Sequence, residues 1–195
     1  MELLEKHAER DPLRQFAAWF EDATEAGLRV PEAVALATAT GEGAPSARMV
    51  LLKDFDERGF VFYSNYESRK GRELEANPRA ALLFYWDPLR RQVRIEGGVE
   101  RLPAEESAAY FRTRPLGARL SAWASRQSEV VESRAALEDA VRRLRRRELD
   151  VPPHWGGYLL RPRVFEFWQH RDDRLHDRLR YRRERDDWVR ERLAP

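Results

Sequence analysis

Between residues 34 and 102 the chain is divided into short runs of β-type residues by turn residues, which strongly limits its possible folds. Val34–Thr40 and Ser46–Lys53 flank a turn that contains two glycines, and Phe60–Ser64 follows the turn Asp54–Gly59. Connections this short join antiparallel strands, because parallel strands need long crossovers. Helix and strand patterns do not alternate regularly, so a doubly wound parallel fold is not expected.

The remaining patterns predict further strands and a set of helices around this sheet. Asp11 is a suitable N-cap and Pro12 suits a first helical turn, so a helix is expected from there to about Gly27. We predict an antiparallel, Greek-key-like barrel, mainly β with helical decoration, in a single domain of residues 1–195. Residues 1–10 are expected to form a mobile arm. The other predicted strands are Ala80–Trp86, Arg91–Leu102 (bent at Gly97 and Gly98), Tyr158–Gln169, Arg174–Arg183 and Trp188–Leu193, and the other predicted helices are Arg69–Ala76, Pro103–Arg112, Leu116–Ala124 and most of Ser128–Glu148, with a break near Ser133.

Composition excludes several classes of function. Hydrophobic residues make up 42% of the chain, enough for a core, and the lack of cysteine excludes disulfides and thiol nucleophiles. The four histidines form no metal-binding motif, so no metal site is expected. A net charge of +2 and the lack of long apolar runs give no indication of nucleic-acid or membrane binding. The basic run at residues 141–147 is interpreted as a solvated helix face, and we expect a cytoplasmic protein.

Arg174, His176 and Arg178 give the strongest chemical signal, because each lies two residues from the next. Alternate side chains of an extended strand share a face, so this spacing predicts two guanidinium groups flanking an imidazole. Such a surface suits an anionic ligand that exchanges protons. Taken alone, the same spacing fits a solvated basic edge strand equally well.

Two further clusters combine cations with β-strand or helix ends. Arg48–Lys53 is an apolar run with a cation at each end, and it also fits a core strand with charged ends. Arg69 and Lys70 occupy the first turn of a predicted helix, where free N–H groups and two cations would bind a phosphate. An exposed basic turn is the alternative interpretation of this second cluster.

Polar residues on other predicted elements form the remaining candidates. Tyr110 and Arg114 are one helical turn apart and both can donate to a phosphate, although a tyrosine packed on an arginine stem fits as well. Gln92 lies inside a predicted strand, where its amide could both donate to and accept from the polar edge of a ring.

Together these segments resemble the pyridoxamine/pyridoxine 5'-phosphate oxidases, a family of FMN-binding split barrels. The family signature is an apolar residue, Glu, an aromatic residue, Trp and Gln, then four free positions and Arg-Leu-His-Asp-Arg. Here it is matched by residues 165–169 and 174–178. The resemblance runs from about Asp11 to Pro195 and implies an FMN-binding split β-barrel. It also implies a homodimer that holds FMN at the subunit interface.

The resemblance assigns a role to each matching residue. It implies that FMN is bound by Arg48, Met49, Val50, Leu51, Leu52, Lys53, Tyr63, Ser64, Arg69, Lys70, Gln92, Gln127, Ser128, Trp168 and Arg178. It implies that the substrate, with its phosphate, is bound by Lys53, Tyr110, Arg114, Arg174, Leu175 and His176, of which Arg174 and His176 are the expected catalytic residues.

The implied reaction is oxidation of pyridoxamine and pyridoxine 5'-phosphate by O2 to pyridoxal 5'-phosphate and hydrogen peroxide, in vitamin B6 biosynthesis or salvage. Ala118 departs from the family, which commonly has a serine there as another phosphate donor. Loss of one hydroxyl donor would weaken binding by ~1 kcal/mol. Two alternatives stay open: a related flavin oxidase acting on another small aromatic compound, of phenazine type, and a non-catalytic carrier of flavin or pyridoxal phosphate.

Overall fold

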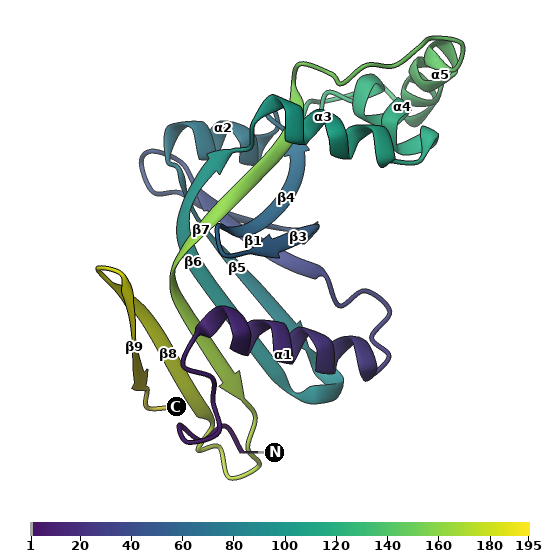
Figure 1. Ribbon diagram of the computed structural model, residues 1–195. Coiled ribbons are helices and arrows are strands. Elements are labelled where there is room, and N and C mark those ends of the chain that lie inside the picture. The colour runs from purple at the N-terminus through teal and green to yellow at the C-terminus, as the bar shows by residue number, and fades with distance from the viewer. Residues whose placement is uncertain (1) are drawn as a thin grey trace.

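The computed structural model describes residues 2–195, which form a curved β-sheet with helices at one end and against one face (Figure 1). The strands are β1 (Ala33–Ala39), β2 (Pro45–Leu51), β3 (Asp54–Asp56), β4 (Gly59–Asn65), β5 (Arg79–Trp86), β6 (Arg91–Arg101), β7 (Trp155–Gln169), β8 (Asp177–Glu184) and β9 (Asp187–Arg192). The helices are α1 (Pro12–Glu25), α2 (Arg69–Ala76), α3 (Ala104–Thr113), α4 (Leu116–Ala124) and α5 (Arg134–Leu144), with a 3-10 turn η1 (Asp87–Leu89).

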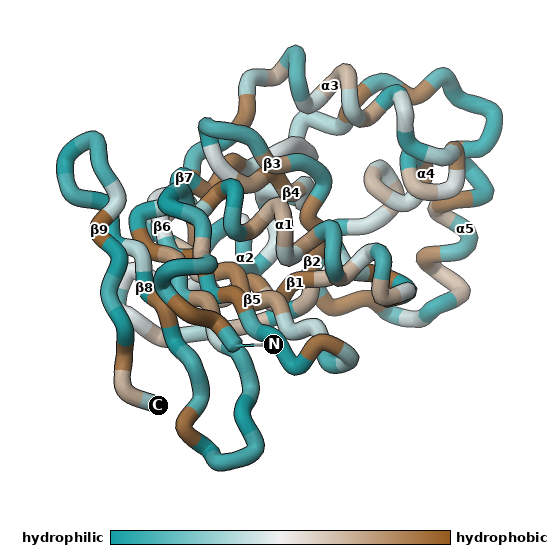
Figure 2. Tube along the Cα trace, turned by 60° about the horizontal axis from the view of Figure 1, so that its bottom comes forward, coloured by the Kyte–Doolittle hydropathy of each residue, from teal (hydrophilic) through white to brown (hydrophobic). Residues whose placement is uncertain are grey.

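All paired strands are antiparallel, and they run in the order β2-β1-β5-β6-β7-β4-β3, with β8 pairing both β7 and β9. The prediction of a mainly β, antiparallel split barrel with helical decoration is confirmed. Figure 2 shows hydrophobic residues concentrated in β1 and β5, which lie inside the sheet rather than at its edges.

The long strand β7 divides the sheet into two parts. One edge of β7 pairs with β6 over most of its length, whereas the other pairs with β4 over Trp155–Leu160 and with β8 over Val164–Gln169. A register shift between Glu96 and Gly97 lies next to this division. A Cβ on Gly97 would lie 1.9 Å from the carbonyl oxygen of Arg161, so only glycine allows the two backbones to approach this closely.

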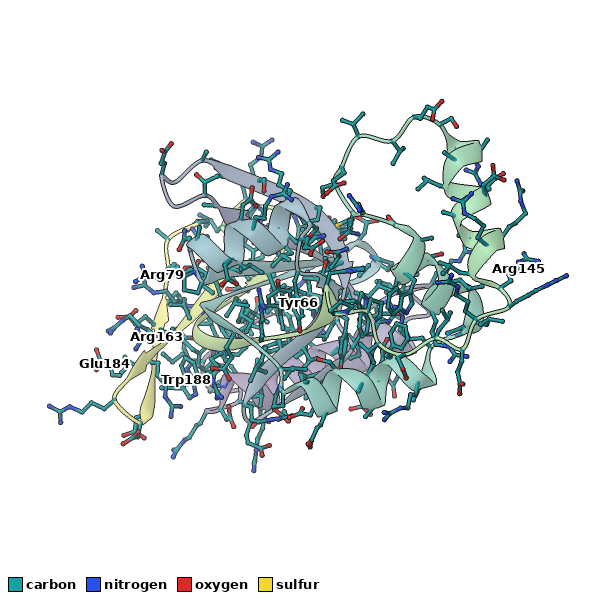
Figure 3. All side chains as sticks on the ribbon, turned by 90° about the horizontal axis from the view of Figure 1, so that it is seen from above. Tyr66, Arg79, Arg145, Arg163, Glu184 and Trp188 are labelled. Carbon is teal, nitrogen blue, oxygen red and sulfur yellow. The ribbon has the colours of Figure 1, made fainter. Side chains whose placement is uncertain are left out.

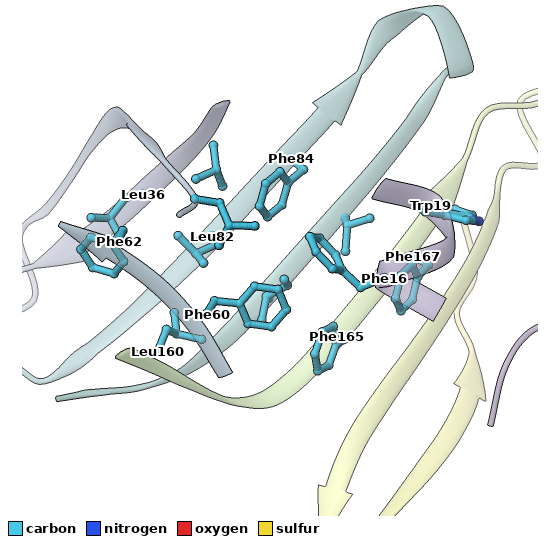
Figure 4. Close-up of a cluster of buried hydrophobic side chains, with 14 of the residues drawn as sticks. Phe16, Trp19, Leu36, Phe60, Phe62, Leu82, Phe84, Leu160, Phe165 and Phe167 are labelled. Atoms are coloured by element: carbon cyan, nitrogen blue, oxygen red, sulfur yellow. The ribbon is translucent and has the colours of Figure 1, made fainter. Parts of the chain in front are cut away.

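Helix α1 packs against the sheet and completes the core (Figure 4). Asp11 accepts a hydrogen bond from the Leu13 amide at 2.8 Å and Pro12 is the first helical residue, as the sequence predicts. Phe16 is fully buried, and its ring centroid lies 4.9 Å from that of Phe60 on β4. The helix therefore anchors the two parts of the sheet to each other through aromatic packing.

Helices α2 to α5 gather at one end of the sheet, and both termini lie toward the other end (Figure 1). Arg145 follows α5 and points away from the rest of the molecule (Figure 3). This placement fits the interpretation of the basic run as a solvated face. Among residues 2–195, no helix is long and apolar enough to cross a membrane, and no group of three metal-ligating side chains comes together.

Three local predictions are wrong. Residues 54–56 form the short strand β3 rather than part of a turn, and residues 128–133 are not helical. The predicted break near Ser133 is confirmed, since α5 begins after this residue, whose side chain accepts from the Ala136 amide as N-cap. Strand β8 begins at Asp177 and not at Arg174, which has a left-handed φ of 64°. The Asp173 side chain accepts from the Leu175 amide at 3.0 Å, so a local turn replaces the first residues of the expected strand.

Residues 2–10 lie against the C-terminal strands. The Leu3 amide donates to Asp177 at 3.2 Å, Arg192 pairs with Glu5 at 2.6 Å, and the Tyr181 hydroxyl donates to the carbonyl of Glu9. Met1, the first residue of the predicted mobile arm, lies outside the described residues. The mobility expected for the arm stays a prediction.

Candidate functional site

A cavity of about 480 Å³ opens between β2, the end of β4 and the helices α2 to α4. We call it the main pocket. It brings together most of the residues expected to bind FMN or the substrate phosphate, which come from distant parts of the sequence. Those lining it are Arg48, Met49, Val50, Leu51, Lys53, Tyr63, Ser64, Lys70, Tyr110, Arg114 and Gln127. Leu52, which lies within the same run, is instead packed into the core.

The main pocket has a polar end at the start of α2. Ser68 caps the helix by accepting from the Gly71 amide, and the Arg69 amide donates to the Ser128 hydroxyl at 3.1 Å. The ammonium group of Lys70 donates to Gln127 at 2.8 Å and to Ser64 at 3.1 Å. A helix N-terminus with two cations in its first turn offers positive charge to an anion.

The pKa of Lys70 reflects this crowded position. Burial is the main cause that lowers the pKa to about 8, and the nearby Arg48 guanidinium lowers it further, against the opposing effect of Glu73. An anion placed beside Lys70 would favour the charged ammonium form. The polar end is therefore suited to a negatively charged ligand. Within the chain, the Glu73 carboxylate already offsets part of the positive charge beside Lys70.

Glu73 links the cations of this end although the sequence did not single it out. Its side chain is 4% exposed and accepts from Arg69 at 2.9 Å, Arg48 at 3.2 Å and Ser46 at 2.6 Å, and also from Thr38. Burial alone would raise the pKa of Glu73, but these hydrogen bonds outweigh it and lower the pKa to about 2. The spacing of four residues between Arg69 and Glu73 was the available signal for this pair.

An aromatic wall faces the polar end. The rings of Tyr63 and Tyr110 stack with centroids 4.0 Å apart, and Tyr63 also stacks on Trp155 at 5.3 Å. Burial raises the pKa of Tyr63 to about 12 and also raises that of Tyr110, so both phenols are neutral hydrogen-bond donors at pH 7. The wall can cover the flat face of an aromatic ligand.

Arg114 carries an unpaired donor beside this wall. Its guanidinium lies over Trp155, 4.7 Å from the ring centroid, and its Nη1 atom is buried without a hydrogen-bond partner in the described part of the chain. Burial lowers the pKa of this guanidinium. Because an unpaired buried donor is costly, the geometry favours an anion bound at this point.

The remaining predicted residues form a second group, which we call the C-terminal cluster: Gln92, Trp168, Arg174, Leu175, His176 and Arg178. Gln92, Trp168 and Arg178 are direct neighbours in register across β6, β7 and β8, so they share one face. Arg178 donates to the buried Glu166 at 2.9 Å, which fixes its guanidinium.

His176 and Arg174 belong to the loop before β8, which corrects the prediction that both lie on a strand face with Arg178. The His176 ring lies 4.7 Å from that of Trp168, and its Nδ1 accepts from the Arg171 amide at 3.0 Å. A neutral ring in this arrangement carries its proton on Nε2. Arg174 and Leu175 are both exposed.

The two groups lie at opposite ends of β7. Trp155 lines the main pocket and Trp168 lies in the C-terminal cluster. The strand has 15 residues and at about 3.3 Å per residue spans up to roughly 50 Å. One chain therefore does not bring all the predicted site residues together. Asn65, Ser121, Ser125 and Trp155 line the main pocket without having been predicted, because no local pattern distinguishes them from ordinary helix and strand residues.

The residues of the main pocket fit a flavin mononucleotide and a phosphorylated aromatic compound. Arg48 and Lys70 line the pocket at the N-terminus of α2 and suit a phosphate, and Arg69 of the same helix lies outside the lining. Arg114 offers its unpaired donor to a second anion. The exposed Met49 and Leu51 and the stacked tyrosines supply apolar surface beside these charges.

Comparison with known proteins identifies the family of the chain. Residues 20–147 match the family described as pyridoxamine 5'-phosphate oxidase, and residues 155–195 match the pyridoxine 5'-phosphate oxidase C-terminal dimerisation region. The chain is 60% identical to a pyridoxine/pyridoxamine 5'-phosphate oxidase of Rubrobacter xylanophilus, covering 99% of this chain and 91% of the relative. It is 58% identical to the enzyme of that name from Salinibacter ruber, covering 100% and 94%.

Among solved structures, PhzG from Burkholderia lata in complex with tetrahydrophenazine-1-carboxylic acid is similar with a TM-score of 0.94 and 35% identity, covering 99% of this chain and 98% of that one. A pyridoxamine 5'-phosphate oxidase-related, FMN-binding protein from Nostoc punctiforme shares the fold with a TM-score of 0.76 at 20% identity, covering 96% and 100%. The chain belongs to the pyridoxamine 5'-phosphate oxidase family.

Proposed function

We propose that this protein is an FMN-dependent oxidase that converts pyridoxamine 5'-phosphate and pyridoxine 5'-phosphate to pyridoxal 5'-phosphate in the cytoplasm. Oxidation of the amine consumes O2 and water and releases ammonia and hydrogen peroxide; the alcohol consumes O2 and releases peroxide alone. The observation that carries the proposal is Arg114, whose unpaired buried donor lies beside Tyr110 in the pocket that also contains Lys53.

The residues divide the work between two phosphates. Arg48, Arg69 and Lys70 are proposed to bind the phosphate of FMN at the start of α2. Lys53, Tyr110 and Arg114 are proposed to bind the phosphate of the substrate. When bound by these residues, FMN would supply the redox chemistry between the substrate and O2.

The C-terminal cluster is proposed to act on the substrate's reacting end. The proton on Nε2 of His176 and the exposed guanidinium of Arg174 can donate to the ring substituents of the substrate and orient its carbon. Trp168 and Gln92 share a face with Arg178 and can contact the flavin ring. Catalysis by these groups rests on orientation and charge, since none of the predicted site residues is a carboxylate.

A complete site is proposed to require a second copy of the chain, because the two residue groups lie far apart in one copy. The sheet face formed by β2, β1 and β5 exposes apolar side chains, with Met49 63% and Tyr85 56% exposed, and Leu83 lies beside them. Met49 also lines the main pocket, and Tyr85 is in register with Gln92 of the C-terminal cluster. A second copy docked across this face by a two-fold axis would bring the two groups together twice.

The first experiment is aerobic turnover of the FMN-loaded protein with pyridoxamine 5'-phosphate. Aldehyde and hydrogen peroxide are measured together, and equal amounts are expected. Bound FMN with neither product would contradict the proposed substrate, and peroxide without aldehyde would show uncoupled oxidation of the flavin.

The role of Arg114 gives this experiment a matched pair of variants. Arg114→Met should raise the KM for the phosphorylated substrate by about tenfold to a hundredfold, because charged hydrogen bonds to the phosphate are lost. Arg112→Met, in the last turn of α3 and outside the pocket, should leave the KM unchanged. Equal KM values in both variants would contradict the proposal that Arg114 binds the substrate phosphate.

A phenazine-type oxidase is the second candidate, and two observations favour it. The fold is close to that of PhzG, and Ala118 lines the main pocket where the family commonly has a serine. Ser121 lines the same pocket from the same helix and offers a hydroxyl that now donates to the Gly117 carbonyl. Faster turnover of a reduced phenazine carboxylic acid than of pyridoxamine 5'-phosphate would favour this candidate.

A further inference from the structure

Glu73 is a buried carboxylate that joins two cations from different elements. Arg48 comes from β2 and Arg69 from the first turn of α2, and each donates to a different oxygen of the Glu73 carboxylate. Thr38 and Ser46 donate to the oxygen that faces Arg48. Every side chain that contacts the carboxylate is therefore charged or polar, and Arg48 among them lines the main pocket. We call Arg48, Arg69, Lys70 and Glu73, together with the start of α2, the phosphate end.

Fold stability alone is a weak reason for this arrangement. A buried ion pair gains little over a well-packed apolar contact, because taking the charges out of water offsets their attraction. The Glu73 carboxylate has an exposed counterpart on the same helix, Glu75, which pairs at 2.7 Å with Arg101, and neither residue of this pair lines the main pocket. Glu73 differs in that both its arginine partners are among the residues proposed to bind FMN.

The charges at this end match a phosphate. Arg48, Arg69 and Lys70 together carry three positive charges, and Glu73 carries one negative charge. The net charge of these four side chains is therefore two positive charges. It is opposite in sign and close in size to the charge of a phosphate monoester, which is about −1.5 to −2 at pH 7. Without Glu73, three cations would crowd one another in the free protein, and the arginine side chains would be free to swing into solvent.

We propose that Glu73 is a positioning residue for the cofactor phosphate: it holds Arg48 and Arg69 in one fixed arrangement and sets the net charge of the phosphate end to that of a phosphate dianion. This inference rests on the proposed function, because it takes FMN as the ligand of this end. It gives Glu73 no contact with the substrate and no part in the redox step.

Glu73→Gln tests the inference because it removes the charge and keeps the shape. An amide cannot accept from both arginines, since one end of it is a donor. FMN affinity of the apoprotein, measured by quenching of flavin fluorescence, should fall by about tenfold to a hundredfold. Riboflavin, which lacks the phosphate, should bind with unchanged affinity. Glu75→Gln is the matched control and should bind both flavins as the unchanged protein does.

The outcomes separate positioning from simpler roles. If Glu73 were only a negative charge near the phosphate, Glu73→Gln would bind FMN more tightly, and that result would overturn the inference. An equal loss of FMN and riboflavin affinity would mean a general structural role and would overturn it too.

A second variant guards against misfolding. Glu73→Asp keeps the charge but shortens the side chain, so it cannot reach both arginines and should also lose FMN affinity selectively. Circular dichroism of each apoprotein reports folding before binding is measured. If the unchanged protein binds no FMN, the proposed function fails; if it binds FMN and both variants bind equally well, only this inference fails.

Discussion

Single residues at the polar end of the main pocket have properties set by their surroundings rather than by their type. Lys70 loses its usual solvation, and its pKa is lowered to about 8, whereas the pKa of Glu73 is lowered to about 2. The two shifts leave the carboxylate always charged and the ammonium partly neutral just above pH 8. Proton exchange at this end therefore falls on Lys70.

FMN binding by the apoprotein should weaken as pH rises from 7 to 9. The pKa of Lys70 lies below its usual value of 10.5, so the free protein loses this proton near pH 8. A bound phosphate raises the pKa again, so binding takes up a proton above pH 8, with up to about tenfold loss of affinity per pH unit. Titration calorimetry in buffers of different ionisation enthalpy measures that uptake. Lys70→Gln should show neither the uptake nor the pH dependence, and a constant affinity between pH 7 and 9 in the unchanged protein would contradict the assignment.

At the scale of single residues, the sequence predicted residue types but not the protonation or the hydrogen-bond partners of each side chain. The spacing of Arg69 and Lys70 in a first helical turn was enough to predict an anion site there. Glu73 was not predicted, because its partners Thr38, Ser46 and Arg48 are brought to it only by the pairing of β1 with β2 and by the packing of α2.

Among the secondary-structure elements, α2 is held in place by a close backbone contact in its first turn. Gly71, in its first turn, lies so close to the preceding loop that a Cβ would be 2.0 Å from the carbonyl oxygen of Tyr66. The N-terminus of α2 can therefore approach the end of β4 only with glycine at this position. The same contact fixes where the cations of the first turn lie.

Gly71→Ala should destabilise the protein by roughly 1–3 kcal/mol, because the backbones must move apart. Alanine normally stabilises a helix by about 1 kcal/mol relative to glycine, so the sign is reversed here. Gly117→Ala in α4 is the control, since its Cβ would meet nothing within 4 Å and should stabilise the protein. Urea unfolding followed by circular dichroism measures both. Equal stabilisation by the two alanines would show that α2 does not need this close approach.

The predicted elements were accurate where capping and breaking residues bound them. The ranges of α2 and α4 agree with the sequence prediction, since Ser68 and Pro115 mark their starts. The start of β8 was placed three residues too early, because alternation in a charged run cannot distinguish a strand from a turn held by the Asp173 side chain. Arg174 and His176 therefore lie in the loop before β8 and not on its strand face.

At the scale of the whole molecule, the resemblance predicted a list of site residues that a single chain does not unite. The main pocket and the C-terminal cluster occupy opposite ends of β7. Sequence order carries no information on which residues come from which copy, so this division was visible only in three dimensions. The exposed apolar face across β2, β1 and β5 reaches both ends, since Met49 lines the main pocket and Tyr85 is in register with Gln92 of the C-terminal cluster.

Leu83→Arg should prevent association of two chains through that face. Leu83 lies on β5 in register with Ala35 of β1, at the middle of the exposed face, and a buried unpaired charge there is costly. Analytical ultracentrifugation should show a monomer that is folded and binds FMN at least about tenfold more weakly. Val130→Arg, at a fully exposed loop position, should remain dimeric. A dimeric Leu83→Arg protein would place the interface elsewhere.

The distance between the two ends of β7 also has a consequence for inheritance. In the proposed two-copy site, a chain without Arg114 would have a damaged pocket but a sound C-terminal cluster, and a chain without Arg178 would have the reverse. Each would be inactive when paired with itself. A mixed pair of the two would join the sound pocket of one chain to the sound cluster of the other, and so restore one working site. Two defective alleles of this gene, one lacking Arg114 and one lacking Arg178, would then restore activity when both are expressed in the same cell.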